Sequence, residues 1–197
     1  MTSSEHGSSV EIRRLDAGDV GLLGEIDRSE QLDMIYQVVG GELVASPTDF
    51  FVPRWSTTDD GDHSVAHIVR FAAPIVERGA TFLGAYRGGE LVGLMVVEGD
   101  YRPNVAWFAL LHVSRQARRS GAASALWAAA EKVARGAGAT KLYVSSAPTG
   151  SAVGFYFSRG CRLATKSEII QELFELEPED THLVCELGDS PVRATAG

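Results

Sequence analysis

The chain alternates between stretches with the two-residue period of strands and stretches with the longer period of helices. Apolar residues recur at helical spacing from Ser64 to Arg78, where Asp62 can cap a helix, Pro74 is expected to kink it and Gly79 to end it. In chain order, we predict strands over 10–15, 42–44, 81–86, 90–97, 105–113, 140–146, 168–176 and 182–187. We predict helices from Asp16 or Asp19 through Ile26, over 64–78, up to about Arg135 and over 151–158.

This order of elements predicts an α/β protein with one domain. A chain of 197 residues is long enough to bury a full core. Residues 1–9 are polar and Ser-rich and are predicted to be disordered, residues 10–188 to form the domain, and residues 189–197 to be a flexible tail. The segment 27–58 has mixed signals, and we expect irregular loops there around a short strand at 42–44.

Composition and charge narrow the class of protein. The formal net charge of −8 disfavours non-specific binding of nucleic acid. No apolar run approaches the roughly 20 residues of a membrane span, and the polar first residues do not resemble a secretory signal. Cys161 and Cys185 are too few for a disulfide framework and lack the spacing of metal ligands, so we expect free thiols and no metal. We therefore predict a cytoplasmic protein with neither a nucleic-acid nor a membrane partner.

One stretch joins a predicted strand to a predicted helix through three arginines. After Val113 come Arg115, Arg118 and Arg119, and then Gly121 with two alanines. The first turn of a helix exposes backbone N–H groups and the positive end of its dipole, and small residues let an anion approach closely. The stretch lacks the Walker and dinucleotide glycine patterns. It therefore predicts a pyrophosphate site of another kind, with a plain strand-to-helix turn as the alternative.

Two segments resemble the signatures of the GNAT acetyltransferase superfamily. Residues 118–123, Arg-Arg-Ser-Gly-Ala-Ala, match the pattern Gln/Arg-x-x-Gly-x-Gly/Ala of its cofactor loop. Residues 148–161 resemble its second signature, which includes Tyr156, although Thr149 stands where members often carry Asn. The resemblance covers about 104–164. It implies an N-acetyltransferase that uses acetyl-coenzyme A (acetyl-CoA), built on a mixed, strongly twisted sheet of about six to seven strands with helices on both faces.

The resemblance also implies roles for individual residues. The pantetheine arm of the cofactor would pair with the strand end at 111–113, and the N–H of His112 or Leu111 would face the thioester carbonyl. Tyr156 stands where the family's phenol protonates the leaving thiolate, and a buried core aromatic is the alternative. The residues implied in cofactor binding are Leu111, His112, Val113, Arg118, Arg119, Ser120, Gly121, Ala122, Ala123, Ser124 and Thr149.

The general base and the acceptor site stay open. An ammonium acceptor must lose a proton before it attacks, and His112 is a candidate base because histidine titrates near neutral pH. Further candidates for the base, and for binding the acceptor, are Glu98, Asp27 and Glu30. Glu98 follows a hairpin strand, and Asp27 and Glu30 lie in a charge-dense segment that resembles the acceptor side of the family. Each of these side chains could instead be solvated or capping. Together with the acidic segment 59–62, these acidic residues favour a polyamine or an aminoglycoside-like amine as the acceptor.

Three functions therefore remain. The first is transfer of an acetyl group from acetyl-CoA to the primary amine of a small molecule, by direct attack through a tetrahedral intermediate. The second is the same reaction on a protein N-terminus or lysine, and the third is a non-catalytic CoA-binding module. The long segment 27–62 favours a walled site for a small acceptor, and Tyr156, Gly121 and Ala123 disfavour the third reading. Members of the family often form homodimers; the oligomeric state, the acceptor, the base and the acyl chain stay open.

Overall fold

A computed structural model describes residues 9–188, so the predicted tails fall outside it except for residue 9. The described chain divides into two compact units. Unit 1 contains residues 9–29, 53–96 and 110–129, and unit 2 contains residues 30–52, 97–109 and 130–188. The single domain expected over 10–188 stays a prediction.

The described strands form one mixed sheet of seven and a separate pair. The order in the sheet is β1-β4-β5-β6-β7-β9-β8, and β5 and β6 contribute residues to both units. The strands of this sheet are β1 (Glu11–Leu15), β4 (Thr81–Arg87), β5 (Glu90–Arg102), β6 (Val105–Val113), β7 (Lys141–Ser146), β8 (Arg162–Leu163) and β9 (Thr181–Glu186). The pair β6 and β7 is parallel, whereas β7 and β9 are antiparallel. The predicted α/β class is confirmed.

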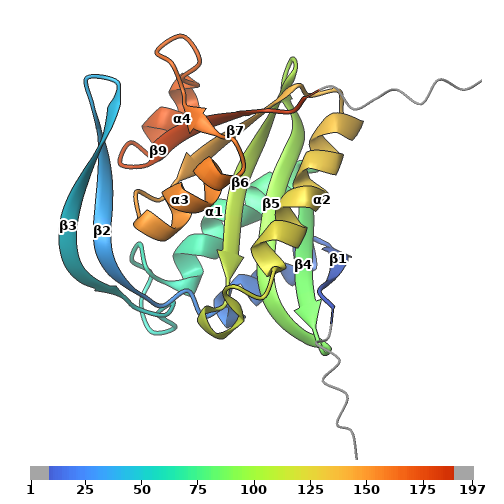
Figure 1. The fold of residues 1–197 in the computed structure, drawn as a ribbon. Coiled ribbons are helices and arrows are strands. Elements are labelled where there is room, and N and C mark those ends of the chain that lie inside the picture. Colours follow the sequence, from blue (N-terminus) through green and yellow to red (C-terminus); the bar gives the residue numbers. More distant parts are fainter. Residues whose placement is uncertain (1–8, 189–197) are drawn as a thin grey trace, which may run out of the picture. The chain divides into compact units, whose positions relative to one another are not determined.

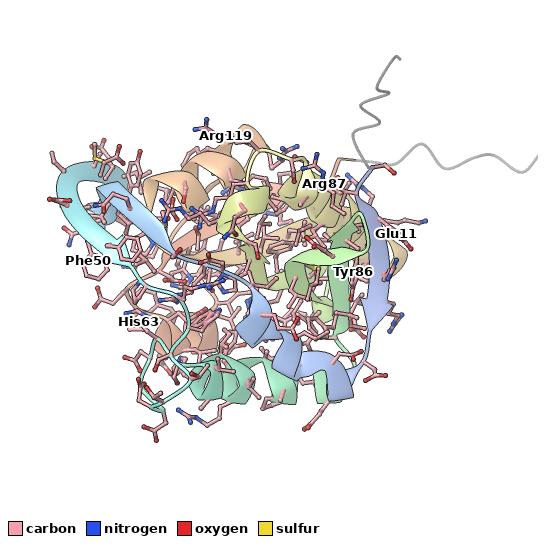
Figure 2. All side chains as sticks on the ribbon, turned by 90° about the horizontal axis from the view of Figure 1, so that it is seen from below. Glu11, Phe50, His63, Tyr86, Arg87 and Arg119 are labelled. Carbon is pink, nitrogen blue, oxygen red and sulfur yellow. A yellow bond between two sulfur atoms is a disulfide. The ribbon has the colours of Figure 1, made fainter. Side chains whose placement is uncertain are left out.

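In unit 1, the first strand pairs with a later one. β1 runs antiparallel to β4, with Glu11 opposite Tyr86 and Leu15 opposite Phe82 (Figures 1 and 2). The following 3-10 helix η1 (Ala17–Glu25) begins with a capping box, in which the side chains of Asp16 and Asp19 each accept a hydrogen bond from the backbone N–H of the other residue. The predicted helix from Asp16 is therefore present, with 3-10 geometry.

The helix predicted over 64–78 is α1 (Val65–Glu77). Its cap is Ser64, whose hydroxyl accepts from the N–H of His67 at 3.0 Å, so the expected cap at Asp62 is wrong. Pro74 lies inside the helix, which continues to Glu77. The apolar face is buried as its spacing predicts, with Ile68, Ala72, Ile75 and Val76 inside.

In unit 2, the segment expected to be irregular is a long hairpin (Figure 1). β2 (Glu30–Val39) and β3 (Glu42–Val52) pair antiparallel, so the expectation of loops around a short strand is wrong. Gly40 and Gly41 form the two-residue turn, with φ of 63° and 89°. Pro47 faces Met34 beside an irregularity in the register, which lets a strand contain a residue that cannot donate a hydrogen bond.

The final elements of unit 2 differ in part from the prediction. Helix α3 (Gly150–Ser158) and strand β9 lie where expected. The strand expected over 168–176 is wrong, because Gln171–Leu176 is the short helix α4. Ile170 and Leu173 are both buried and lie three residues apart, a spacing that fits a helix and not a strand. No helix in residues 9–188 is long and apolar enough to cross a membrane.

The two cysteines form a disulfide, so the expected free thiols are wrong. Cys161 follows α3 and Cys185 lies in β9; both are buried and their Cα atoms are 4.1 Å apart. The two-residue strand β8 brings them together, because Arg162 pairs with Val184. β8 was not predicted, so nothing in the sequence placed the two cysteines side by side.

Candidate active site

The predicted phosphate loop lies in unit 1, between β6 and α2 (Ala122–Gly136). After the short 3-10 helix η2 (Arg115–Ala117), Arg119 and Gly121 both have a left-handed backbone, with φ of 63° and 88°. The N–H of Ala125 donates to the carbonyl of Gly121 at 2.9 Å. The N–H groups of Ala122 and Ala123 therefore precede the first turn of the helical ladder. This is the open helix end that the sequence predicts.

The surroundings of this loop fit a phosphate group. A Cβ atom placed on Gly121 would have no heavy atom within 4 Å, so space is open above the backbone. The hydroxyl of Ser120 is buried and has no hydrogen-bond partner among the described residues. The side chain of Arg119 is exposed and projects outward (Figure 2). An open helix end, a donor without a partner and a cation are together suited to bind an oxyanion.

Hydrogen bonds tie the loop to the segment after η1. The N–H of Arg115 donates to the carbonyl of Asp27 at 2.8 Å, and the N–H of Asp27 donates to the hydroxyl of Ser114 at 3.1 Å. The guanidinium of Arg118 donates to the carbonyl of Arg28 at 3.2 Å. Residues 27–28 therefore hold the loop in place.

The carboxylate of Asp27 is buried and its oxygens are occupied. It accepts from the hydroxyl of Ser29 at 2.6 Å and from the amide of Gln116 at 3.2 Å, and Arg54 lies 3.3 Å away. These contacts, the Ser29 hydroxyl first, lower the pKa of Asp27 against the opposing effect of burial. Asp27 therefore anchors its neighbours, and few acceptor sites on its oxygens remain for an ammonium group.

His112 lies at the end of β6 against an aromatic side chain. Its ring meets that of Trp55 edge to face, with centroids 5.3 Å apart. Burial and, to a smaller extent, the charges of Arg28 and Arg118 together lower the pKa of His112 to about 4. The imidazole is therefore neutral at pH 7 but is a weak acceptor for a proton.

Arg28, which the sequence did not single out, completes this part of unit 1. Its guanidinium lies over the ring of Trp55, with Cζ 3.9 Å from the ring centroid. It donates to the carbonyl of Pro53 at 3.2 Å and bonds to Nδ1 of His63 at 2.6 Å. Burial lowers the pKa of Arg28, yet an arginine stays charged at any working pH. No motif marks this residue; only the fold brings it to Trp55.

Tyr156 lies in α3 of unit 2. The helix begins at Thr149, whose hydroxyl accepts from the N–H of Ala152. The side chain of Tyr156 is 6% exposed, and its ring meets that of Phe108 edge to face. Burial, and then the charges of Asp180 and Glu177, raise the pKa of the phenol, which is therefore protonated at neutral pH. A protonated phenol is what a general acid needs.

Two carboxyl groups near the end of unit 2 were not predicted as site residues. Burial raises the pKa of Glu177 to about 8, with a contribution from the charge of Asp180, and burial raises the pKa of Asp180 to about 6. Both act on the phenol of Tyr156 by charge. The sequence shows only a turn, Pro-Glu-Asp, at this point. Carboxyl groups that titrate near neutral pH are candidates for proton transfer.

The other predicted acidic residues fall into both units. Glu30 begins β2 and Glu98 lies in β5, both half-buried and both in unit 2. In unit 1, Asp59 accepts from the hydroxyl of Ser56 and from the N–H of Gly61, which makes it part of a turn. Within residues 9–188, no group of three or more His, Cys, Asp or Glu side chains is arranged to hold a metal ion.

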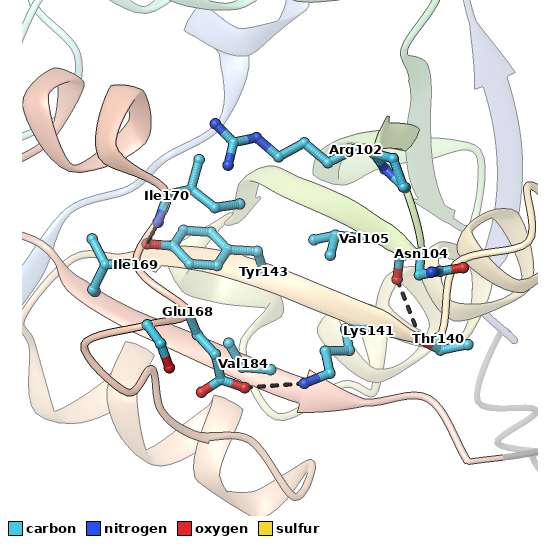
Figure 3. Close-up of a pocket in the computed structure, with 12 residues that line it drawn as sticks. Arg102, Asn104, Val105, Thr140, Lys141, Tyr143, Glu168, Ile169, Ile170 and Val184 are labelled. Carbon is cyan, nitrogen blue, oxygen red and sulfur yellow. Dashed lines mark hydrogen bonds and ion pairs between the residues drawn. The ribbon is translucent and has the colours of Figure 1, made fainter.

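A separate cavity of about 470 Å³ lies within unit 2 (Figure 3). Its charged lining residues are paired: Lys141 contacts Glu168 at 3.0 Å, and Arg102 contacts the carboxylate of Glu172. The hydroxyl of Tyr143 accepts from the N–H of Ile170 at 3.3 Å. The charged groups that line this cavity are thus paired, and none of its lining residues was predicted as a site residue.

The sequence matches the family model described as the acetyltransferase (GNAT) family over residues 42–161, which is more than half of the chain. The chain belongs to the GNAT acetyltransferase family. It is therefore an acyltransferase by family, and the matched range includes the predicted phosphate loop and Tyr156. No curated protein matches the sequence significantly.

Solved GNAT structures share the fold at low sequence identity. Nourseothricin acetyltransferase is 19% identical with a TM-score of 0.66, over 91% of this chain and 99% of that one. A proposed streptothricin acetyltransferase from Bacillus anthracis str. Ames, in complex with acetyl-CoA, is 15% identical with a TM-score of 0.62, over 89% and 96%. N-acetylglutamate synthase from Neisseria gonorrhoeae, complexed with coenzyme A and L-arginine, is 20% identical with a TM-score of 0.58, over 92% and 34%. The family match bears out the predicted donor, acetyl-CoA.

Proposed function

We propose that this GNAT protein transfers an acetyl group from acetyl-CoA to the primary amine of a small molecule. The observation that carries the proposal is the loop of unit 1, where left-handed backbone at Arg119 and Gly121 leads into the open end of α2. Residues 118–124 would hold the pyrophosphate through backbone N–H groups and arginine charge. The strand end at 111–113 would pair with the pantetheine arm.

Acetyl-CoA supplies an acetyl thioester as the electrophile. The role of the chain is to orient the thioester and to stabilise the charge that develops on its carbonyl oxygen during direct attack by the amine. We assign that role to a backbone N–H at Leu111 or His112, because a fixed donor aimed at a developing oxyanion lowers the barrier. Tyr156 would then donate its phenolic proton to the leaving thiolate, and its raised pKa keeps that proton in place until it is needed.

The proton of the acceptor ammonium needs a separate destination. His112 is a poor one, because its pKa of about 4 lies far below that of an ammonium group. The carboxylate of Asp27 is occupied by hydrogen bonds. Glu177 and Asp180, with raised pKa values of about 8 and about 6, are better matched to neutral pH. We leave the base unassigned among these two, the predicted candidates Glu30 and Glu98, and a water relay.

A small acceptor is favoured over a protein acceptor by two considerations. The names of the three structural neighbours described above refer to nourseothricin, streptothricin and N-acetylglutamate, which are small molecules. The segment 30–52 is an ordered hairpin and not an open, irregular stretch. Acetylation of a protein N-terminus or lysine is the alternative acceptor class, and a non-catalytic CoA-binding module is the alternative to catalysis.

Calorimetric titration of the purified protein with acetyl-CoA tests the cofactor assignment, with coenzyme A, ATP and NAD as controls. We expect binding of acetyl-CoA and coenzyme A in the micromolar range and no binding of ATP or NAD. Thiol release from acetyl-CoA in the presence of small amines, and separately of peptides with free N-termini or lysines, then tests the reaction. Binding without thiol release from any amine would favour the non-catalytic module, and absence of binding would refute the loop assignment.

A further inference from the structure

The cluster around Arg28 in unit 1 has a cation that is not paired with any carboxylate among residues 9–188. Its members are Arg28, Trp55, His63 and His112. Within residues 9–188, the polar partners of the Arg28 guanidinium are a carbonyl and an imidazole nitrogen, and neither carries negative charge. The adjacent carboxylate of Asp27 is committed to Ser29, Gln116 and Arg54. A half-buried cation in this state favours an anionic ligand.

The guanidinium also has donors to spare. Of its five N–H groups, one donates to Pro53 and one bonds to His63, which leaves three without a partner in the described part of the chain. The planar fork of arginine matches the two oxygens of a carboxylate. Trp55 supports the fork on one side at 3.9 Å, so little side-chain freedom is left to lose on binding.

The guanidinium of Arg28 is linked through Trp55 to the strand end at which we expect the reaction. Trp55 contacts both the Arg28 guanidinium and the ring of His112, and the charge of Arg28 is felt by that imidazole. His112 belongs to the strand end to which we assign the thioester. A ligand held by Arg28 therefore lies beside the strand segment where the amine is expected to attack, and the loop arginine Arg118 is tied to the carbonyl of the same residue.

We propose that Arg28 binds a carboxylate of the acceptor, so that the substrate is an amine that also carries an acid group, such as an α-amino acid. This inference rests on the proposed function and specifies its substrate class. It replaces the expected preference for a polyamine, because the Arg28 guanidinium has no carboxylate partner among residues 9–188 and the adjacent carboxylate of Asp27 is already paired with Arg54. An ammonium group of a polycation would be repelled by the guanidinium of Arg28.

Paired acceptors test the inference in a thiol-release assay. A panel of L-amino acids is compared with the corresponding carboxamides, which keep the amine and lose the acid. We expect the best acid to exceed its carboxamide at least about 10-fold in kcat/KM. Arg28→Gln is expected to bring that ratio close to one, and Arg28→Lys to leave an intermediate ratio, since it keeps the charge without the fork. The control Arg87→Gln removes the same charge from the exposed end of β4 and is expected to keep the wild-type ratio.

The same variants separate an acceptor carboxylate from a phosphate of the cofactor. If Arg28→Gln weakens acetyl-CoA binding in calorimetry and leaves the ratio of acid to carboxamide unchanged, the anion belongs to the cofactor and the inference is overturned. A wild-type enzyme that acetylates acids and carboxamides equally also overturns it. Thermal melting of each variant identifies any that fail to fold. If Arg28→Gln does not fold, the ratio of acid to carboxamide in Arg28→Lys decides between the two outcomes.

A binding measurement separates this inference from the proposed function. The indole N–H of Trp55, buried and without a partner among the described residues, gives an NMR signal that Trp55→Phe assigns. We expect L-amino acids to shift this signal in the wild type, carboxamides to leave it in place, and Arg28→Gln to abolish the response. If amino acids shift the signal but no thiol is released from acetyl-CoA, the carboxylate site at Arg28 is supported and the proposed acetyl transfer is refuted. If carboxamides cause thiol release but no amino acid shifts the signal, the proposed acetyl transfer is supported and the carboxylate site at Arg28 is refuted.

Discussion

The ring of Trp55 meets the ring of His112 edge to face, at an interplanar angle of 89°. Trp55 is 8% exposed, and its ring also packs against the guanidinium of Arg28. One aromatic side chain thus positions both a neutral imidazole and a cation at the end of β6. The depressed pKa of His112 depends on this packing, because burial is its largest cause.

Replacement of Trp55 by alanine is therefore expected to raise the pKa of His112 from about 4 towards its ordinary value of 6.5. Loss of a buried tryptophan should also lower the free energy of unfolding by about 3 kcal/mol. NMR titration of the imidazole and chemical denaturation measure the two effects. Trp55→Phe keeps an aromatic ring and should shift the pKa less; equal pKa values in both variants and the wild type would show that the packing is not the cause.

Glu177 gives the stability of the protein a dependence on pH. Its pKa is raised from 4.5 to about 8 in the folded state, so the folded protein binds more protons than the unfolded chain between these values. Stability should therefore fall as pH rises from about 4.5 to about 8. Glu177→Gln, which cannot ionise, is expected to melt roughly 5 °C higher than the wild type at pH 8.5 and to differ little at pH 4.

The exposed neighbour Glu179 supplies the control for this measurement. Glu179→Gln removes the same charge two residues away and should leave the difference in melting temperature between pH 4 and pH 8.5 as in the wild type. If both glutamine variants stabilise the protein equally at pH 8.5, the effect comes from net charge and not from the burial of Glu177.

The parts of the site that the sequence predicted are those that local chemistry determines. The loop before α2 was predictable because Gly121 and two alanines stand between a predicted strand and a predicted helix, and a helix end always leaves N–H groups open. Strand β6 was predictable because its apolar run is continuous. The resemblance to the family then supplied Tyr156, whose burial agrees with a core position as well as with an acid.

The parts that the sequence did not predict depend on contacts between distant segments. Arg28, Trp55 and His112 come from three separate stretches, and no spacing along the chain relates them. The hairpin 30–52 was missed because Pro47 argues against a strand until the irregular register opposite it is known. The disulfide was missed because it requires β8, which has only two residues.

Removal of the disulfide tests that correction. The bond between Cys161 and Cys185 closes a loop with a sequence separation of 24, for which chain entropy suggests about 3 kcal/mol of stabilisation. The double variant Cys161→Ser/Cys185→Ser should therefore melt well below the oxidised wild type. A reducing agent should lower the melting temperature of the wild type and leave that of the double variant unchanged. Mass spectrometry of alkylated protein that finds two free thiols without reduction would contradict the bond.

Gly121 allows a paired test of the cofactor loop. Gly121 and Gly138 have nearly the same left-handed backbone, with φ of 88° and 84°, and neither would place a Cβ within 4 Å of another atom. Alanine at either position should cost about 1 kcal/mol of stability for the same backbone reason. Only Gly121→Ala should also raise the Kd for acetyl-CoA, and the bulkier Gly121→Val should raise it more. If both alanine variants bind acetyl-CoA like the wild type in calorimetry, the loop assignment fails.

Arg118→Ala is expected to weaken acetyl-CoA binding in a salt-dependent way. A partly solvated phosphate is screened by salt, so the loss of affinity should shrink as ionic strength rises. Arg118 also donates to the carbonyl of Arg28, which gives the side chain a structural contact. Calorimetry at low and high salt distinguishes the two roles, because a loss of equal size at both would indicate the structural contact alone.

Tyr156→Phe tests the proposed acid. The substitution keeps the ring against Phe108 and removes only the hydroxyl, so melting temperature and acetyl-CoA affinity should stay close to those of the wild type. Turnover should fall by roughly 10²-fold or more, because the leaving thiolate loses its proton donor. Tyr143→Phe is the matched control: its hydroxyl accepts from the N–H of Ile170 and bonds to His182, so its loss should reduce stability and spare turnover. If Tyr156→Phe instead lowers stability and leaves kcat unchanged, Tyr156 is a core aromatic and the proton must come from another group.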